Sequence, residues 1–468
     1  MDATYRLADW THGLRFEALP ASTVEAAANL LLDTIGSSIA AWDAPGVREL
    51  RALMAEWTAG PSQVWIAGEN LSPPAATLVN SAMAHALEFD DLHKELPLHA
   101  GAVVVPAALA VAQAVPGATG RELVVAIVAG TEILARLARA NLNYRGTAGF
   151  RGFNPTSIIA GFGAAAVAGR LLGLDAAGIA RAMGLSYAQA SGNQQCIADG
   201  GLVKRMQPGF VAEAGVRAAW LARAGVTGAV DALEGKNGYF NVYEQGEYDA
   251  PALTAGLGEA FEIEKLAFKR YPVCGMAQPA VDSLRDLFEQ PGFARENIAS
   301  IAVEGSKFVI DMVGRPYAPG PNPEVDAQFN IAYCLATTLE TGTIGLADIG
   351  PAKTLDPDRI RRANAVPVTL DASLEGKWTS RVRVTNRQGA EASRIRKAAA
   401  GQTDKPVQAG ELMRKFLDAA AASGAAFGPG GAEQLAELLL QAPELPDLAP
   451  LMRALTPGGL EEPRRRIA

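Results

Sequence analysis

The sequence predicts a mostly α fold, in which a large all-helical domain is accompanied by a smaller α+β domain. Three observations lead to this prediction. Apolar residues recur with helical spacing through the first half of the chain, and Ala and Gly fill many positions between them. From about residue 265 onward, β-branched residues gather at 298–313, and polar and apolar residues alternate on both sides of Asn386–Gly389, as in a hairpin. Helical spacing then returns at 410–422 and 431–441.

The first half of the chain carries several predicted helices. One boundary is clear, because Gly173 ends a helix and Asp175 caps the next one. The glycine-rich run at 160–169 lacks both the GxGxxG spacing and a preceding strand, so helix packing explains it better than dinucleotide binding. The predicted helices are 21–41, 73–88, 102–115, 119–140, 156–172, 175–192 and 208–224.

The length of the chain favours more than one domain, since 468 residues exceed the size at which a single core stops growing. Two further amphipathic helices, 277–289 and 325–340, lie among the strand-like segments of the second half. We therefore expect three segments: an all-helical domain, an α+β domain, and a C-terminal segment that packs back on the helical domain. Their predicted limits are 1–266, 267–398 and 399–468.

Composition excludes several classes of partner. A net charge of −8 argues against nucleic acid and anionic membranes, although a local cationic pocket for a small anionic molecule remains compatible with it. The longest apolar run, 100–115, is too short for a membrane span, and the N-terminus shows no signal-peptide pattern. Three widely spaced cysteines without a CxxC pair indicate neither a disulfide framework nor a zinc site, and they fit a cytoplasmic protein.

The stretch "AHALEFDDLHKELPLHAG" at 84–101 holds three of the four histidines of the chain. Its His and carboxylate side chains admit three interpretations: a metal site, an acid/base site, or a polar helix end. The metal interpretation is the weakest, because Pro97 interrupts the spacing and the chain has no second His or Cys cluster to complete a coordination sphere. The polar residues concerned are His85, Glu88, Asp90, Asp91, His93, Glu95 and His99.

Two other segments supply cations. Lys204 and Arg205 in "GGLVKRMQPGF" precede a predicted helix N-terminus, where free N–H groups and the helix dipole favour an anion. Lys269 and Tyr271 in "FKRYPVC" lie where the two predicted domains join, and ligand sites are common in such clefts. The alternative for Lys204 and Arg205 is that they are ordinary solvated side chains.

Taken together, these stretches resemble the MmgE/PrpD family. The matching pieces are "HALEFDDLH…HAG", "FNPTSIIAGFGAAAVAGRLLGL", "KRMQPGFVAEAGVRAAWLARAGVTG", "LEGKNGYF", "FKRYPVC" and "DAQFNIAYCLATTLETG", in the family's order. The resemblance implies a helical domain with an inserted α+β domain, and an active site in the cleft between them. It also implies small di- or tricarboxylate substrates, no obligatory metal or organic cofactor, and a homodimer.

The resemblance also implies roles for single residues. Lys204 matches the family lysine, a base or carboxylate anchor, and His99 matches a histidine that can act as acid or base. Asp90 and Asp91 match the family's paired aspartates, whereas Glu88 stands where an aspartate is typical. Leu92 replaces the usual Thr or Ser.

Three amides stand where many relatives have histidine, and an amide cannot titrate near neutral pH. This departure predicts a substrate other than 2-methylcitrate or cis-aconitate. The three are Asn154, Gln207 and Gln278.

The sequence therefore predicts a cofactor-independent lyase or isomerase that moves a proton next to a carboxylate. Its predicted catalytic residues are Lys204, His99, Asp91 and Glu88. Its predicted substrate-binding residues are Asp90, Asn154, Arg205, Gln207, Lys269, Tyr271 and Gln278. Two alternatives stay open: a catalytically degenerate small-anion binding protein of the same fold, and a metal-dependent hydrolase that uses His85, His93 and Asp90.

Overall fold

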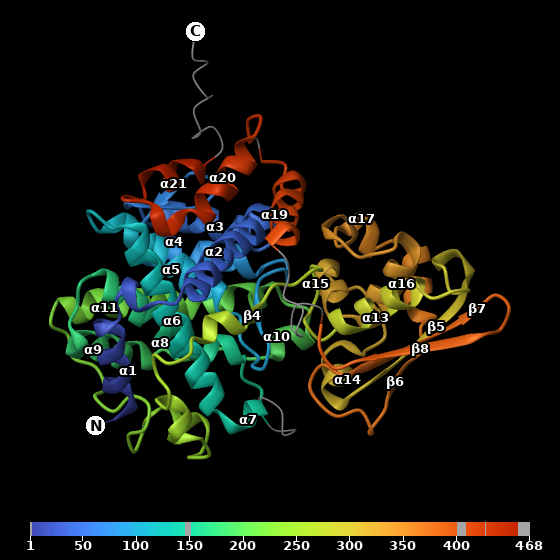
Figure 1. Ribbon diagram of the computed structural model, residues 1–468, viewed down its shortest axis with the longest axis horizontal. Coiled ribbons are helices and arrows are strands. Elements are labelled where there is room, and N and C mark those ends of the chain that lie inside the picture. Colours follow the sequence, from blue (N-terminus) through green and yellow to red (C-terminus); the bar gives the residue numbers. More distant parts are fainter. Residues whose placement is uncertain (1, 146–150, 400–408, 426, 457–468) are drawn as a thin grey trace, which may run out of the picture.

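The computed structural model describes residues 2–145, 151–399, 409–425 and 427–456, and its ribbon forms a large helical part beside a smaller part that contains a sheet (Figure 1). The prediction of a mostly α fold with an α+β part is confirmed. Among the described residues, no helix is both long enough and apolar enough to cross a membrane.

The helical part contains all seven helices predicted for the first half, with two shorter than expected. The helix predicted to end at residue 88 stops at His85, and the one predicted to end at residue 192 stops at Tyr187. The longer helices are α1 (Ala3–Gly13), α2 (Ala21–Ala41), α3 (Val47–Trp57), α4 (Pro73–His85), α5 (Gly101–Ala114), α6 (Gly120–Ala140), α8 (Pro155–Leu171), α9 (Ala176–Tyr187) and α11 (Gln207–Arg223). Short helices are α7 (Leu142–Arg145), α10 (Gln195–Ala198) and α12 (Tyr239–Tyr243).

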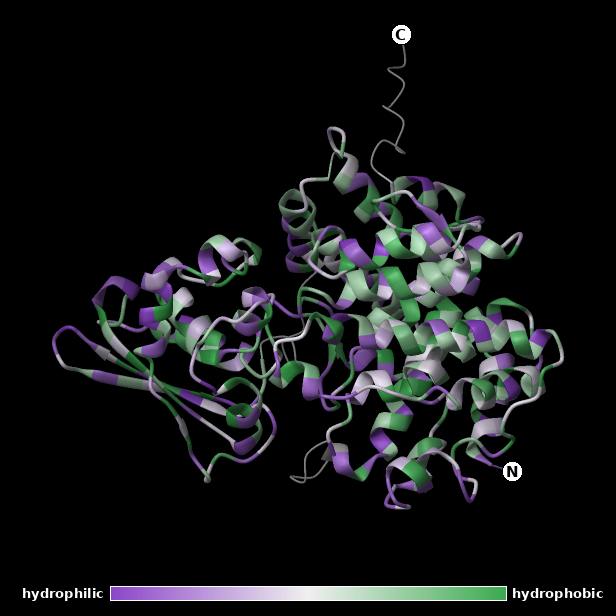
Figure 2. Ribbon diagram, turned by 180° about the vertical axis from the view of Figure 1, so that it is seen from behind, coloured by the Kyte–Doolittle hydropathy of each residue, from purple (hydrophilic) through white to green (hydrophobic). Residues whose placement is uncertain are grey.

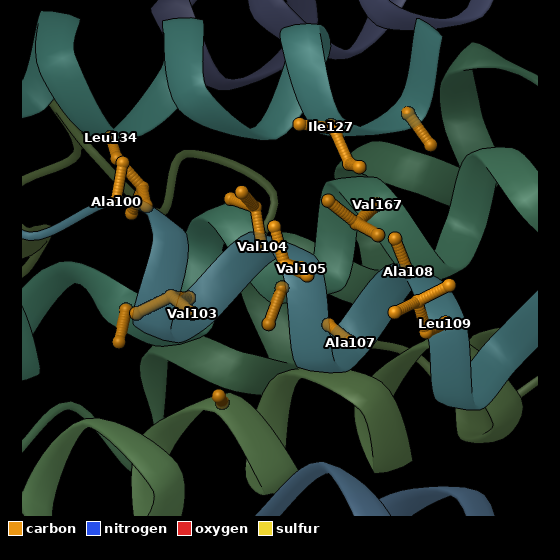
Figure 3. Close-up of a cluster of buried hydrophobic side chains, with 14 of the residues drawn as sticks. Ala100, Val103, Val104, Val105, Ala107, Ala108, Leu109, Ile127, Leu134 and Val167 are labelled. Atoms are coloured by element: carbon orange, nitrogen blue, oxygen red, sulfur yellow. The ribbon is translucent and has the colours of Figure 1, made fainter. Parts of the chain in front are cut away.

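Helix α5 lies at the centre of this part. Its residues from Gly101 to Ala112 are all buried, and Val104 and Ala108 pack near Ile127 of α6 and Val167 of α8 (Figure 3). Small residues allow such close approach between helices. A Cβ added to Gly215 of α11 would lie 2.5 Å from the carbonyl oxygen of Gly161 in α8, which agrees with the packing interpretation of the glycine-rich run.

The α+β part is built on a four-stranded sheet with strand order β6-β5-β7-β8. Strand β5 pairs with β6 in parallel and with β7 in antiparallel orientation, and β7 and β8 form the predicted hairpin. The strands are β5 (Ile298–Gly305), β6 (Val368–Leu370), β7 (Ser380–Asn386) and β8 (Glu391–Arg396). The helices are α13 (Gln278–Phe288), α14 (Lys307–Val313), α15 (Pro323–Gln328), α16 (Ile331–Thr341), α17 (Pro351–Thr354) and α18 (Pro357–Asn364).

Two predictions for this part need correction. The strand expected over 298–313 ends at Gly305, and α14 follows, because Val309 and Val313 lie four residues apart and are buried together on one helical face. The helix expected over 325–340 is two helices. Asn330 caps the second one, since its side chain accepts a hydrogen bond from the backbone N–H of Tyr333.

The C-terminal helices return to the helical part. Helices α19 (Ala409–Ala422), α20 (Gly431–Leu440) and α21 (Ala449–Ala454) lie on the same side as α2, where the red end of the chain meets the blue end (Figure 1). Apolar side chains form two separate clusters, one over residues 3–266 and 412–455 and the other over 271–384. Hydrophobic residues accordingly gather inside each part (Figure 2). The predicted limits at 266 and 398 stay predictions.

Candidate active site

A cavity of about 640 Å³, counted out to its open mouth, is lined by residues from both parts of the molecule. The helical part contributes His85, Glu88, Leu92, Pro97, His99, Asn154, Pro155, Thr156, Gln194, Ile197 and Lys204. The α+β part contributes Cys274, Gly275, Met276, Met312, Phe329 and Trp378. Four of the predicted site residues, Glu88, His99, Asn154 and Lys204, therefore face the same space.

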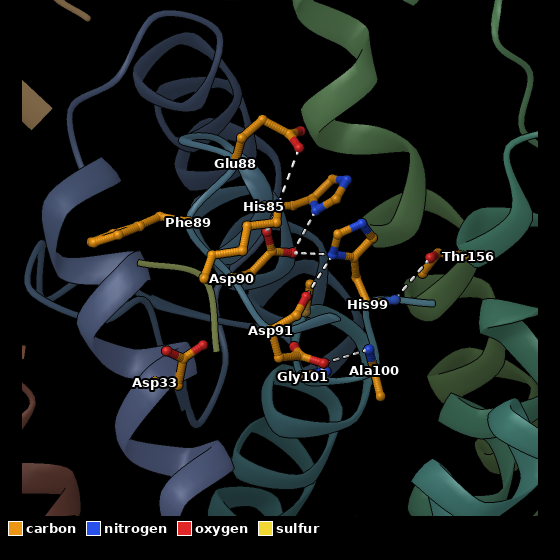
Figure 4. A network of polar contacts seen from close by, with 12 residues as sticks. Asp33, His85, Glu88, Phe89, Asp90, Asp91, His99, Ala100, Gly101 and Thr156 are labelled. Atoms are coloured by element: carbon orange, nitrogen blue, oxygen red, sulfur yellow. Dashed lines mark hydrogen bonds and ion pairs between the residues drawn. The ribbon is translucent and has the colours of Figure 1, made fainter. Parts of the chain in front are cut away.

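The histidine-rich stretch connects α4 to α5, and two features hold it in place. Its short strand β3 (Leu92–His93) pairs with β4 (Leu266–Ala267), just before the α+β part begins. The carboxylate of Asp91 accepts hydrogen bonds from the backbone N–H groups of Ala100 (3.1 Å) and Gly101 (2.9 Å), at the start of α5 (Figure 4). Burial, with Asp90 and Asp33 nearby, raises the pKa of Asp91 well above its usual value. The structure thus places Asp91 at a helix start rather than among the cavity's lining residues.

His85, the last residue of α4, lies between a carboxylate and a cation. Its Nδ1 is 2.6 Å from Oδ2 of Asp90, and its Nε2 is 2.8 Å from Nζ of Lys204. Burial opposes the charge of Asp90, but His85, Lys269 and His99 outweigh it and lower the pKa of this carboxyl below its usual range. Burial, and then the Lys204 ammonium, lower the pKa of His85 to about 4. A neutral His85 therefore donates from Nδ1 to Asp90 and accepts at Nε2 from Lys204.

Glu88 connects the two buried lysines of the site. Its carboxylate forms an ion pair with Lys204 through Oε1 and lies 3.2 Å from Nζ of Lys269 through Oε2. Lys269 also lies 3.4 Å from Asp90 and has no exposed side-chain surface. The backbone of Glu88 has φ +52°, which is uncommon for a residue other than glycine, and this turn aims its side chain at the lysines.

His99 is placed as the site's most accessible imidazole. Its Nδ1 lies 2.6 Å from the backbone oxygen of Asp91 and 3.5 Å from Oδ2 of Asp90 (Figure 4). A carbonyl oxygen only accepts, so Nδ1 carries the proton and the lone pair is left on Nε2. The side chain is 23% exposed, and its ring centroid lies 5.1 Å from that of His85. Burial lowers the pKa of His99 to about 3, although Asp90 acts in the opposite direction.

Lys204 comes from the short 3-10 helix Leu202–Met206 that precedes α11. Its ammonium also lies over the ring of Phe329, 5.3 Å from the centroid. Burial and the nearby Lys269 lower the pKa of Lys204 well below its usual value, while the direct ion pair with Glu88 favours the charged form. The site thus holds two lysines against two carboxylates, and all four side chains are buried.

Asn154 lines the cavity as the N-cap of α8. Its Oδ1 accepts a hydrogen bond of 3.2 Å from the backbone N–H of Ser157. Next to it, Thr156 accepts from the backbone N–H of His99 over 3.1 Å, so the start of α8 helps to position that histidine.

Arg205 and Gln207 are not brought to the cavity wall. The guanidinium of Arg205 is buried and donates to the backbone oxygen of Pro45 over 2.6 Å. The amide of Gln207 accepts from the backbone N–H of Asn193 and donates to its carbonyl oxygen, at 2.7 and 2.9 Å. Both side chains support the loops around Lys204 from behind.

Tyr271 and Gln278 also lie outside the cavity's lining. The hydroxyl of Tyr271 donates to Asp282 over 2.9 Å, and burial raises its pKa. The amide of Gln278 donates to the backbone oxygens of Tyr271 (2.7 Å) and Val273 (3.1 Å) at the start of α13. These contacts hold the turn that carries Cys274, Gly275 and Met276 to the cavity.

Of the three residues of the metal-dependent alternative, His85 and Asp90 lie together, but His93 lies apart from them. His93 points to Glu262, with 3.0 Å between Nε2 and Oε2, and its Nδ1 accepts from the backbone N–H groups of Glu95 and Leu96. Within the described residues, the side chains that could converge on one ion are His85, Asp90 and His99, whose ligand atoms lie within 4.8 Å of one another.

Sequence reasoning missed two features of the site. It assigned His85 only to the metal alternative, although His85 lies three residues before Glu88 and five before Asp90. A turn directly after the helix brings all three together, and a helix extended to residue 88 conceals that turn. The apolar wall with Met312 and Trp378 carried no signal, because the docking of the α+β part alone brings it to the histidines.

Comparison with known proteins shows which class of enzyme this chain is similar to. A cis-aconitate decarboxylase of Aspergillus terreus is 28% identical over 352 residues, which cover 72% of this chain and 71% of that protein. A second cis-aconitate decarboxylase, from A. terreus strain NIH 2624, is 26% identical over 478 residues. This match covers 97% of this chain and 95% of that protein. The human cis-aconitate decarboxylase is 25% identical over 268 residues, which cover 56% of this chain and 54% of that protein. With the cavity and its buried acid/base groups, this kinship supports an enzyme of the lyase type.

The family model described as the MmgE/PrpD N-terminal domain matches residues 5–251, and the model for the MmgE/PrpD C-terminal domain matches residues 271–438. The chain therefore belongs to the MmgE/PrpD family, as its motifs predicted.

Proposed function

We propose that this protein is a lyase or isomerase that moves a proton on a carbon next to a carboxylate or another carbonyl group. One observation carries the proposal: His99 and Lys204 line the same cavity, and His85 lies between them, 2.8 Å from the lysine and with its ring 5.1 Å from that of His99. An acid/base group and a cation for an anionic substrate are thus held at one place.

In the proposed reaction, the Lys204 ammonium binds the substrate carboxylate and Nε2 of His99 removes a proton from the adjacent carbon. The electron pair of the broken C–H bond moves into an enolate, whose charge the ammonium stabilises. The protonated His99 then returns its proton, either to a departing hydroxyl group or to another carbon. Asp90, 3.5 Å from His99, stabilises the imidazolium in between.

A decarboxylation uses the same groups in a different order. The substrate loses CO₂, the electron pair of the broken C–C bond stays on carbon, and an acid delivers a proton there. The relatives named cis-aconitate decarboxylases support this version, at 25–28% identity in the matches above. All versions need a movable proton beside a bound anion, and none requires a metal or an organic cofactor.

We also propose a cytoplasmic homodimer, in which the three buried free cysteines stay reduced.

The test is a panel of mono-, di- and tricarboxylates with hydroxy, 2-oxo and unsaturated members, cis-aconitate included, incubated with the protein in D₂O. Proton NMR reports C–H exchange, loss of water and loss of CO₂ in one experiment. We expect at least one acid to exchange or react, and His99→Ala and Lys204→Ala to lower that rate by about 10²-fold or more. His12→Asn changes an exposed histidine near the N-terminus. It serves as the control and is expected to keep the wild-type rate.

The competing proposal, a small-anion binding protein, has two observations in its favour: Lys204 is already paired with Glu88, and Asn154 cannot titrate. Thermal stabilisation by several acids, without exchange or turnover of any of them, would decide for the binding protein. Turnover that survives both alanine variants in folded protein would overturn the catalytic assignment.

A further inference from the structure

The two walls of the cavity differ in chemistry. Among the described residues, the lysine, histidine and carboxylate side chains that line it all come from the helical part, namely His85, Glu88, His99 and Lys204. The α+β wall consists of side chains without charge: Cys274, Gly275, Met276, Met312, Phe329 and Trp378. Burial raises the pKa of the Cys274 thiol, which keeps this wall uncharged at neutral pH. A ligand in the cavity therefore meets a polar side and an apolar side.

The charges of the polar side are already balanced. Among the described residues that line the cavity, Lys204 is the only lysine or arginine, and it forms an ion pair with Glu88. Lys269 lies behind, fully buried against Glu88 and Asp90. One carboxylate can share the Lys204 ammonium. A second or third would find only neutral donors such as Asn154 and Gln194, beside the carboxylate of Glu88 and the apolar wall, and a buried charge without a countercharge is costly.

We infer that the substrate is an acid with one carboxylate head and an apolar body, rather than a tricarboxylate. The head lies at Lys204 and His99, and the body lies against Met276, Met312 and Trp378 on the α+β wall. This inference rests on the proposed function for the place of the reacting end. It deepens that proposal by naming the class of substrate.

Binding measurements test the inference without turnover. The probes are butanoate, hexanoate and tricarballylate (propane-1,2,3-tricarboxylate), titrated calorimetrically into the intact protein at one pH and ionic strength. We expect hexanoate to bind more tightly than butanoate, by about threefold to fourfold per added methylene, and tricarballylate to bind more weakly than hexanoate. Tighter binding of tricarballylate than of hexanoate would overturn the inference.

Two variants locate the apolar body. Trp378→Ala is expected to weaken hexanoate binding by about tenfold and to change butanoate binding much less. Trp57→Ala is the matched control, because Trp57 is 65% exposed in the helical part, and it leaves both affinities unchanged. Equal loss for both acids in Trp378→Ala would contradict the assignment.

Met312→Lys gives an independent test that does not depend on truncating a large side chain. A cation in the apolar wall is expected to raise the affinity for tricarballylate about tenfold relative to Met312→Gln, its uncharged control of similar length. The absence of such a gain in folded protein counts against the proposed position of the wall.

The two proposals fail in different ways. Preference for hexanoate, with no acid of the D₂O panel exchanged or converted, would leave the substrate class standing and remove the lyase or isomerase. Conversion of a tricarboxylate, with weak hexanoate binding, would support the lyase or isomerase and overturn the proposed substrate class.

Discussion

Lys204 donates a hydrogen bond from Nζ to Nε2 of His85 across 2.8 Å, inside the wall of the cavity. Because Nδ1 of His85 bonds to Asp90, a buried Lys–His–Asp chain joins the loop before α11 to the end of α4. The chain fixes the position of the Lys204 ammonium and the tautomer of His85 together. It also places Asp90 between His85 and His99, where its charge acts on both rings.

Asp90→Asn is expected to lower kcat about 10²-fold and to move the acid limb of the pH profile to lower pH. The Asp90 carboxylate raises the pKa of His99, so its removal lowers that pKa further, and the base stays unprotonated to a lower pH. The measurement is kcat and kcat/KM from about pH 2.5 to 7 with any acid that the panel shows to be converted, because the wild-type limb is expected near the His99 pKa of about 3. A lower kcat with an unmoved limb would mean that Asp90 acts only on structure.

The sequence predicts the helical architecture well, because each long helix carries its own periodicity and end signals. Asp175 is an example, since its side chain accepts from the backbone N–H of Gly178 as an N-cap should. Strand and helix are harder to tell apart over 306–313. Seven or eight apolar-rich residues fit both periods, and only the burial of Val309 and Val313 settles the matter.

The site is predictable only as far as residue chemistry shows it. Lys204 and His99 could be predicted as site residues because they match family positions and because a lysine and a histidine suit a carboxylate substrate, and the structure places both at the same cavity. Arg205 and Tyr271 could also donate hydrogen bonds to a carboxylate, but the guanidinium of Arg205 is turned toward Pro45 and the hydroxyl of Tyr271 toward Asp282. The direction in which a side chain points depends on how its loop is packed, and the spacing of residues in the sequence does not encode it.

Asp91→Ala is expected to reduce the free energy of unfolding by about 1–3 kcal/mol, because the backbone N–H groups of Ala100 and Gly101 lose their buried acceptor. Asp91→Asn keeps one acceptor oxygen and is expected to cost less. Denaturant unfolding at pH 7 measures both. Asp175→Ala, which removes a cap distant from the cavity, serves as control for a stability loss without an effect on turnover. A fully stable Asp91→Ala would contradict the structural role.

Chelation is expected to leave activity unchanged. His85, Asp90 and His99 could meet at an ion, but Lys204 and Lys269 already neutralise Glu88 and Asp90 and repel a second cation. The measurement compares turnover before and after EDTA, with metal analysis of the protein as isolated. Loss of activity on chelation, restored by one divalent metal, would instead support the metal-dependent alternative.

Asp33 of α2 and Lys415 of α19 form a buried ion pair, 2.6 Å long, that ties the C-terminal segment to the helical part. The same ammonium donates to the backbone oxygen of Phe89, in the loop that carries Glu88 and Asp90. Burial raises the pKa of Asp33 from 3.8 to about 6, although Lys415 acts against it. The folded protein therefore binds this proton more tightly than the unfolded chain does.

It follows that the contribution of Asp33 to stability falls as pH rises from about 4 to 6.5. Since each pKa unit corresponds to 1.36 kcal/mol, the loss amounts to roughly 3 kcal/mol. The measurement is the free energy of unfolding of the wild type minus that of Asp33→Asn across this range, which we expect to decrease with pH. The double variant Asp33→Asn/Lys415→Met should show the same pH dependence as Asp33→Asn if Asp33 alone is responsible. A difference that rises with pH would mean that Lys415 holds Asp33 ionised, with a pKa below that of the unfolded chain.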